Sequence, residues 1–139
     1  MRQTVATLIA ALLTTAVASA QSYPGDSGIG VERGIQQLNN SGQVGTVTLF
    51  GHGTSTAAVV RLHGVPPGRA QRAGVYRTRD CTSIPSKPEF TLGDVRNGLS
   101  RSIGQVSEDR LLSGNYSVVV YASAQPGAPP TACGWLYAS

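Results

Sequence analysis

The chain has 139 residues and a formal net charge of +4 at pH 7. That length suits one domain, with room for a single hydrophobic core. The excess of basic residues is too small to indicate nucleic-acid binding, so nucleic acid is excluded from the expected partners.

The first 20 residues are typical of a secretory signal peptide. Arg2 supplies a positive charge, residues 5–17 are apolar apart from three threonines, and small residues follow at Ala18-Ser19-Ala20. The apolar run is shorter than the roughly 20 residues that a membrane span needs, so no membrane insertion is expected. We therefore predict a secreted or periplasmic protein. After cleavage, residues 21–32 are rich in Gly, Ser, Pro and Asp, which predicts a flexible leader.

Residues 33–139 are expected to form the folded domain, because β-prone segments alternate there with turn residues. Residues 82–98 hold two prolines and two glycines and are predicted to be a long surface loop. The segment from Ser107 to Gly114 is predicted to form one helical turn, with the serine as its N-terminal cap and the glycine at its C-terminal end. With about seven to eight strands, the pattern predicts an all-β, antiparallel Greek-key β-sandwich. The predicted strands cover residues 33–38, 44–50, 55–63, 73–77, 99–106, 115–121 and 131–137.

The chain contains two cysteines, Cys81 and Cys133. In an exported protein the default expectation is a disulfide, because the compartment is oxidising. Closing a loop of this length would stabilise the fold by about 4 kcal/mol in the chain-entropy model. The alternative is a pair of free or metal-binding thiols.

Short motifs in a particular order resemble the Cu/Zn superoxide dismutase family, especially its short bacterial exported members. The resemblance covers residues 43–137 and implies that family's sandwich fold. The motifs that carry it are Gly45-Thr46-Val47-Thr48-Leu49, Val60-Arg61-Leu62-His63-Gly64-Val65-Pro66-Pro67-Gly68, Cys81, Leu111-Leu112-Ser113-Gly114 before Tyr116-Ser117-Val118-Val119-Val120-Tyr121, and Ala132-Cys133-Gly134.

The metal ligands that the resemblance implies do not carry over to this chain. The family's His-x-His pair falls on Gly74-Val75-Tyr76, and a later ligand position is Tyr121. A redox metal needs several imidazoles and an open coordination position. We therefore expect no cofactor and favour a non-enzyme. The alternative is superoxide dismutation, or copper binding and handling, at a non-standard site through His52 and His63. Those two histidines could lie at one end of the sandwich.

The tyrosines at the ligand positions suggest a second possibility. By the resemblance, Tyr76 and Tyr121 would lie close together on the outer face of one sheet, beside Arg77. Together these residues could form a binding patch for a polar ligand. Alternatively, the tyrosines only fill the space that a metal site would occupy.

Five arginines lie within one 19-residue window and could attract small anions. A solvated loop surface explains the same cluster. The window contains Arg61, Arg69, Arg72, Arg77 and Arg79.

The leading hypothesis is an exported, non-catalytic domain that is similar to superoxide dismutase and lacks its metal site. It would act as a binding or envelope-structural module, with an unknown protein or a small anionic ligand as its partner. A further alternative is a surface contributed to a hetero-oligomer. The sequence does not separate that alternative from a binding module.

Overall fold

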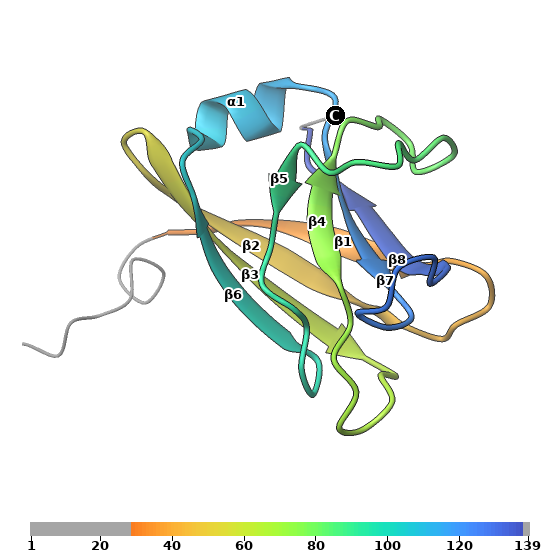
Figure 1. Cartoon of the computed structure of the whole chain (residues 1–139). Helices are drawn as coiled ribbons and strands as arrows, with labels where there is room; N and C mark the ends of the chain where they lie inside the picture. The colour runs from red at the N-terminus through yellow and green to blue at the C-terminus, as the bar shows by residue number, and fades with distance from the viewer. Residues whose placement is uncertain (1–28, 138–139) are drawn as a thin grey trace, which may run out of the picture.

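The computed structural model describes residues 29–137 of the protein. These residues form the predicted all-β, antiparallel fold, with eight strands and one short helix (Figure 1). The predicted signal peptide and residues 21–28 of the predicted leader lie outside the described residues. Residues 31 and 32, which were assigned to the leader, belong to the domain because the first strand begins at Val31.

One half of the sheet pairs its strands in the order β1-β2-β3-β6. β2 and β3 form a nine-residue hairpin ladder that runs from Val44 opposite His63 to His52 opposite Ser55. Ala58, Val60 and Leu62 of β3 point into the core, as the period-2 pattern predicts. The strands are β1 (Val31–Gln37), β2 (Val44–His52), β3 (Ser55–His63) and β6 (Leu99–Gly104).

The other half pairs its strands in the order β5-β4-β7-β8. β5 is a correction to the prediction of a continuous loop over residues 82–98. It is only two residues long, and it forms because the loop returns to the free edge of β4, where Phe90 lies opposite Val75. The strands are β4 (Ala73–Tyr76), β5 (Phe90–Thr91), β7 (Ser117–Tyr121) and β8 (Pro130–Trp135).

The two halves face each other as the layers of a sandwich (Figure 1). β1 joins them, because it pairs with β2 along its first five residues and with β8 through Gln36 and Gln37. At the opposite side, the Ser100 and Ser102 hydroxyls of β6 hydrogen-bond to the backbone of Gly93, two residues after β5. The sheet is therefore nearly closed, and strands that are distant in sequence, such as β3 and β6, lie side by side in a Greek-key arrangement.

The main core lies between the two layers and is built from inward-facing side chains of both. Its members include Ile35, Val47, Val60, Val118 and Leu136, each at most 1% exposed. A second, smaller apolar cluster lies on the opposite face of the β4-β7-β8 layer and contains Tyr76, Val119, Tyr121 and Cys133. The outer face of this layer is therefore covered, whereas a two-layer sandwich usually exposes such a face to water.

The predicted helical turn is observed as α1 (Glu108–Ser113), which lies at one end of the sandwich (Figure 1). The Ser107 hydroxyl accepts a hydrogen bond from the Arg110 amide, and the Gly114 amide donates to the Arg110 carbonyl. Both predicted end residues therefore satisfy backbone groups that a short helix would leave unpaired.

Candidate functional site

Tyr76 and Tyr121 lie side by side on the outer face of the β4-β7-β8 layer. The two strands that carry them are antiparallel neighbours, and the two rings are 5.8 Å apart between centroids and tilted by 57°. This tilted arrangement is one that aromatic pairs favour. The sequence correctly placed the two tyrosines together, but their side chains are buried, with exposed fractions of 2% and 8%.

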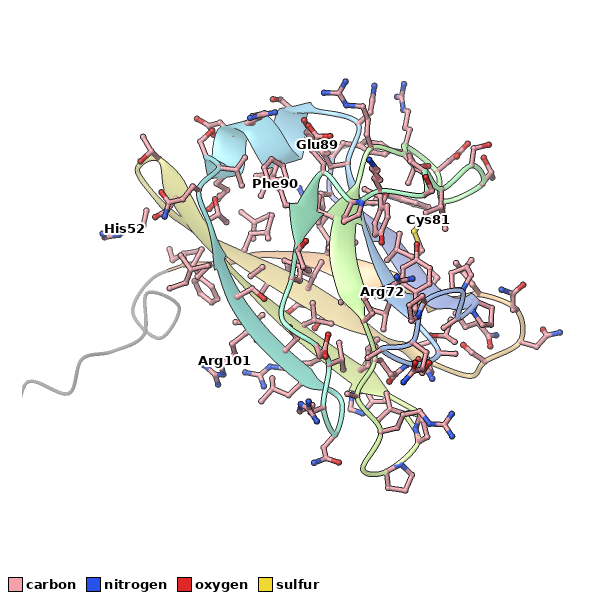
Figure 2. The ribbon with its side chains drawn as sticks, in the orientation of Figure 1. His52, Arg72, Cys81, Glu89, Phe90 and Arg101 are labelled. Carbon is pink, nitrogen blue, oxygen red and sulfur yellow. A yellow bond between two sulfur atoms is a disulfide. The ribbon has the colours of Figure 1, made fainter. Side chains whose placement is uncertain are left out.

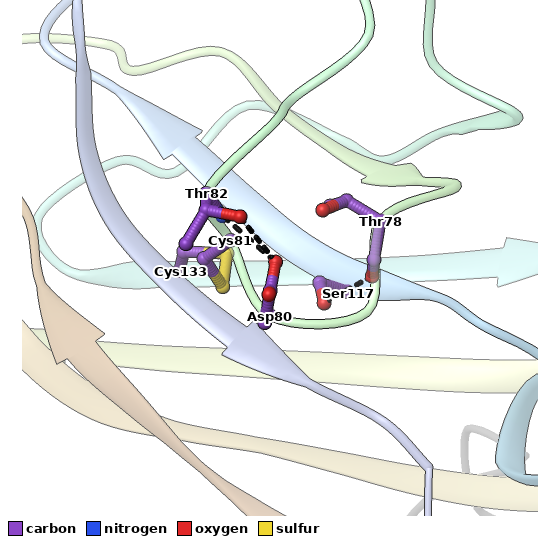
Figure 3. Close-up of a disulfide and its surroundings, with 6 residues drawn as sticks. All are labelled: Thr78, Asp80, Cys81, Thr82, Ser117 and Cys133. Carbon is purple, nitrogen blue, oxygen red and sulfur yellow. Dashed lines mark hydrogen bonds between the residues drawn. A yellow bond between two sulfur atoms is a disulfide. The ribbon is translucent and has the colours of Figure 1, made fainter.

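The segment after β4 packs Cys81 and Ile84 against the tyrosine cluster. Two bonds fix this segment to the sheet, and a third holds its own turn (Figure 3). The predicted disulfide joins Cys81 to Cys133 of β8. The Ser117 hydroxyl of β7 donates to the Thr78 carbonyl at 2.7 Å. Asp80 Oδ1 accepts from both the amide and the hydroxyl of Thr82, and these bonds lower the pKa of Asp80. The turn around Cys81 is thereby held, although Cys81 has a φ of +66°.

Arg72, labelled in Figure 2, lies against one ring of the tyrosine pair. Its guanidinium carbon lies 4.2 Å from the centroid of the Tyr121 ring, which is a cation–π contact. Burial is the main reason that the pKa of Tyr121 is raised, and the Tyr76 hydroxyl raises it further. The two tyrosines therefore form a packed pair in which Tyr121 keeps its proton at neutral pH.

Arg77 does not join the tyrosine pair. Its Nη2 lies 3.4 Å from the Tyr116 hydroxyl and 3.9 Å from Glu89, and Arg110 makes similar approaches to the same two groups. The hydrogen bond from Arg77 is the main reason that the pKa of Tyr116 is lowered, while burial opposes the shift. The predicted patch of Tyr76, Arg77 and Tyr121 is therefore divided between two separate clusters, because Arg77 follows Tyr76 and points to the other side of the strand.

The residues present do not fit the copper and zinc centre that the resemblance implies. His52 and His63 lie at opposite ends of the β2-β3 hairpin, which puts them about 25 Å apart at the usual rise of a strand. The expectation that both could lie at one end of the sandwich is wrong. Both cysteines are consumed by the disulfide. Within residues 29–137, no three or more His, Cys, Asp or Glu side chains converge on a point that could hold a metal ion.

The outer surface has a hollow of about 190 Å³ where the hydrogen-bonded ladder between β1 and β8 ends. The residues of β1 before Gln36 pair with β2 and not with β8. The residues of β8 after Cys133, Gly134 and Trp135, pair with β7. We call this feature the seam hollow. Its lining residues are Arg33, Gly34, Gln36, Cys133, Gly134 and Trp135.

Two glycines allow the seam hollow to exist. A Cβ on Gly134 would collide with the Gly34 carbonyl oxygen, so the two strands approach as closely as their backbones permit. A Cβ on Gly34 would meet only the Gln36 carboxamide, at 3.7 Å, so the space above Gly34 is open. Arg33 spans the seam, and its Nε donates to the Leu136 carbonyl at 3.2 Å. The Arg33 Nη1 also donates to the Glu32 carbonyl at 3.1 Å. The hollow is thus lined by backbone at Gly34 and Gly134, with the Gln36 carboxamide beside the open side of Gly34 and Arg33 among its lining residues.

An aromatic stack borders the seam hollow. The Trp135 ring is stacked on Tyr137, with 6.1 Å between centroids and an interplanar angle of 24°. The Arg79 guanidinium lies 5.1 Å from the Tyr137 centroid. Trp135 is nevertheless 44% exposed, which is unusual for the largest apolar side chain in a small domain. Trp, Tyr and Arg are the residues that most often carry binding energy at interfaces.

The sequence prediction missed this site. Cys133, Trp135 and Tyr137 alternate and so share one face of the last strand, which was a usable signal. The contributions of Arg33, Gly34 and Gln36 could not be found in that way, because β1 lies about 100 residues earlier and its register against β8 is a tertiary property.

No family model matches this chain, and no curated protein is significantly similar to it in sequence. No helix among residues 29–137 is both long enough and apolar enough to cross a membrane.

Proposed function

We propose that the protein is an exported, non-catalytic binding domain, built on a sandwich similar to Cu/Zn superoxide dismutase from which the metal centre has been lost. The observation that carries the proposal is the buried Tyr76–Tyr121 pair. It occupies the positions at which the resemblance implies copper ligands, and a disulfide-anchored segment covers it. A phenol held neutral among apolar side chains is a poor substitute for an imidazole ligand.

The fold supports the comparison with that family. Cu/Zn superoxide dismutase is one of the proteins built on an antiparallel sandwich of this architecture. The cysteines at the two positions that the resemblance implies are paired, here between Cys81 and Cys133.

Export is supported by two independent features. The sequence of residues 1–20 has the charge, apolar run and small residues of a secretory signal peptide. The disulfide suits an oxidising compartment, because cytosolic thiols are kept reduced. The proposed location is therefore periplasmic or extracellular.

Binding is favoured over a purely structural role by the seam hollow and the exposed Trp135 beside it. Trp135 is 44% exposed and lines a concave surface, and tryptophan is among the side chains that most often carry binding energy. The binding surface proposed here is therefore this hollow, and the Tyr76–Tyr121 pair is assigned to packing.

Metal content is the first test of this proposal. We expect the purified, oxidised mature protein to contain no stoichiometric copper or zinc by elemental analysis and to be inactive in a superoxide assay. Added copper should bind weakly, and a His52→Ala, His63→Ala double variant should reduce that binding without changing the melting temperature. One tightly bound copper per chain, or measurable dismutation, would overturn the non-catalytic assignment.

A surface contributed to a hetero-oligomer is separated from ligand binding by a second measurement. A ligand-binding domain is expected to respond to its ligand as an isolated chain, whereas a surface contributed to a hetero-oligomer needs the second protein. Sedimentation analysis of the purified protein, with and without ligand, checks this expectation. A ligand response that required a second protein would contradict it.

A further inference from the structure

We propose that the seam hollow binds the ring of an acidic saccharide, with the apolar face of the sugar against Trp135 and its carboxylate toward Arg33. This inference rests on the proposed binding function and names the class of ligand. The hollow, the aromatic stack and the local charge each support it separately.

The first argument is the position of Trp135. Sugar rings present a face of C–H groups, and these pack well against the electron-rich face of an indole. Tyr137 holds the indole by stacking, and Arg79 in turn lies against Tyr137. A side chain already held in place loses little conformational freedom when a ligand binds, so the aromatic surface is preorganised.

The second argument is the size and lining of the hollow. Pockets for drug-sized ligands measure about 300–1,000 Å³, and this one measures about 190 Å³, which is enough for one ring of a ligand that extends beyond it. Beside Trp135, the lining residues include Arg33 and Gln36, whose side chains carry a guanidinium and a carboxamide. A ligand with one apolar face and a rim of hydroxyl groups matches this division, because each hydroxyl needs a polar partner when water is displaced.

The third argument is charge. Arg33 lies in the wall of the hollow, Arg79 lies at the aromatic stack beside it, and none of the residues that line the hollow is acidic. A guanidinium forms stronger hydrogen bonds with a carboxylate than with a neutral acceptor. The site should therefore prefer a uronic acid over the corresponding neutral sugar.

The experiment uses Trp135 as its reporter, because the chain contains a single tryptophan. The oxidised mature protein is titrated with trigalacturonic acid and, separately, with a neutral galactose trisaccharide while indole fluorescence is recorded. We expect saturable quenching or a spectral shift with the acidic trimer and at least threefold weaker binding of the neutral one. An unchanged spectrum with both sugars overturns the proposal, and equal affinities overturn the preference for the acidic sugar.

Gly34→Val is the decisive variant, because it fills the hollow and leaves Trp135 in place. The open space at Gly34 and its position in a strand make valine compatible with folding. Binding should fall at least tenfold with an unchanged melting temperature, whereas binding that survives Gly34→Val overturns the assigned site. If Gly34→Val does not fold, calorimetric titration of Trp135→Leu replaces it, and the same loss is expected.

Arg33→Gln and Arg61→Gln form the matched pair for charge. Each removes one positive charge, but Arg61 is an exposed residue of β3 and is not among the residues that line the hollow. Only Arg33→Gln should reduce the preference for the acidic trimer, and an equal loss in both variants would mean a general electrostatic effect and contradict the inference.

The metal and superoxide measurements are independent of these titrations. A protein without metal that binds neither sugar would remove this inference and leave the non-catalytic assignment intact.

Discussion

Two buried tyrosines respond to their surroundings in opposite ways. The pKa of Tyr121 is raised above its usual value of 10.0, mainly by burial, and the pKa of Tyr116 is lowered below it, mainly by a hydrogen bond from Arg77. A raised pKa means that the folded state holds its proton more tightly than the unfolded state. A lowered pKa means the reverse.

These shifts predict opposite contributions to stability as the pH changes. Tyr116 should make the free energy of unfolding rise with pH just below 10, since the folded state ionises first. Tyr121 should make it fall as the pH rises above 10, since only the unfolded state then ionises. Each slope is at most about 1.4 kcal/mol per pH unit, the value for one whole proton.

Urea unfolding between pH 8 and pH 11 checks this pair of predictions. Tyr116→Phe should remove the rise below pH 10, and Tyr121→Phe should remove the decline above it. Tyr137→Phe serves as a control, because Tyr137 belongs to neither of the clusters that hold Tyr116 and Tyr121. If the two substitutions changed the pH profile in the same direction, the assigned environments would be wrong.

Alanine substitutions at Gly34 and Gly134 should have contrasting effects on stability. Gly134→Ala places a methyl group against the Gly34 carbonyl oxygen, and either strand must move to relieve the overlap. We expect a loss of about 1–3 kcal/mol in the free energy of unfolding, as for other overpacked sites. Gly34→Ala places its methyl group in open space and should change stability by less than about 0.5 kcal/mol.

Chemical denaturation of both alanine variants measures the contrast. Similar losses at Gly34 and Gly134 would mean that the two strands do not approach as described.

Among the elements, the segment after β4 depends most on a single covalent bond. Cys81–Cys133 spans 52 residues, and opening it should lower the free energy of unfolding by about 4 kcal/mol in the chain-entropy model. The segment would then lose its strongest attachment over Tyr76 and Tyr121. Urea unfolding with and without a reducing agent measures the loss, and hydrogen exchange should show residues 77–88 opening first.

A Cys81→Ser, Cys133→Ser variant is the control for this measurement, because a reducing agent should not change its stability further. A reduced protein as stable as the oxidised one would contradict the tethering role.

A buried polar cluster joins the segments that precede β2 and β4 to strands β7 and β8. Gln71 is 1% exposed, and its Nε2 donates to Gln43 Oε1 and to the Tyr121 carbonyl, at 2.8 and 2.9 Å. The Thr131 hydroxyl donates to the same Gln43 oxygen. Gln71→Leu should cost about 1–3 kcal/mol, because the buried Tyr121 carbonyl loses a donor.

Thermal and urea unfolding of this variant test the prediction. Gln125→Leu, at an exposed residue of the β7–β8 loop, is the matched control and should leave stability nearly unchanged. A neutral Gln71→Leu would show that apolar packing compensates for the lost bonds.

Local sequence signals predicted most of the elements. The alternation at Ala58, Val60 and Leu62 defined β3, and Ser107 and Gly114 marked the helical turn, since these signals act within a few residues. β5 was not predictable, because Phe90 and Thr91 form a strand only where β4 offers a free edge. The disulfide was predictable because the chain contains two cysteines and was expected to be exported to an oxidising compartment.

The candidate site was much harder to predict from the sequence than the fold. The proximity of Tyr76 and Tyr121 followed from the family resemblance, but their burial depends on the covering segment, which has no periodic pattern. The seam hollow is formed by the mutual approach of Gly34 and Gly134, and no property of either segment alone reveals it.

For the molecule as a whole, β8 is the strand on which closure of the fold depends. It pairs with both β7 and β1, holds one cysteine of the disulfide and leads into the buried Leu136. Removing residues 130–139 should therefore abolish cooperative unfolding, which circular dichroism would show.

The pairing of β1 with β8 also determines the order in which the strands can assemble during folding. The first strand cannot find its partner until the last strand is available, so loop closure across almost the entire domain must precede the final contacts. Folds dominated by such distant pairings form in milliseconds to seconds, more slowly than helical domains. A chain with this connectivity remains without its complete fold while its C-terminal strand is still being made. Under the export proposed above, this delay would keep the chain unfolded until all of it had crossed a membrane.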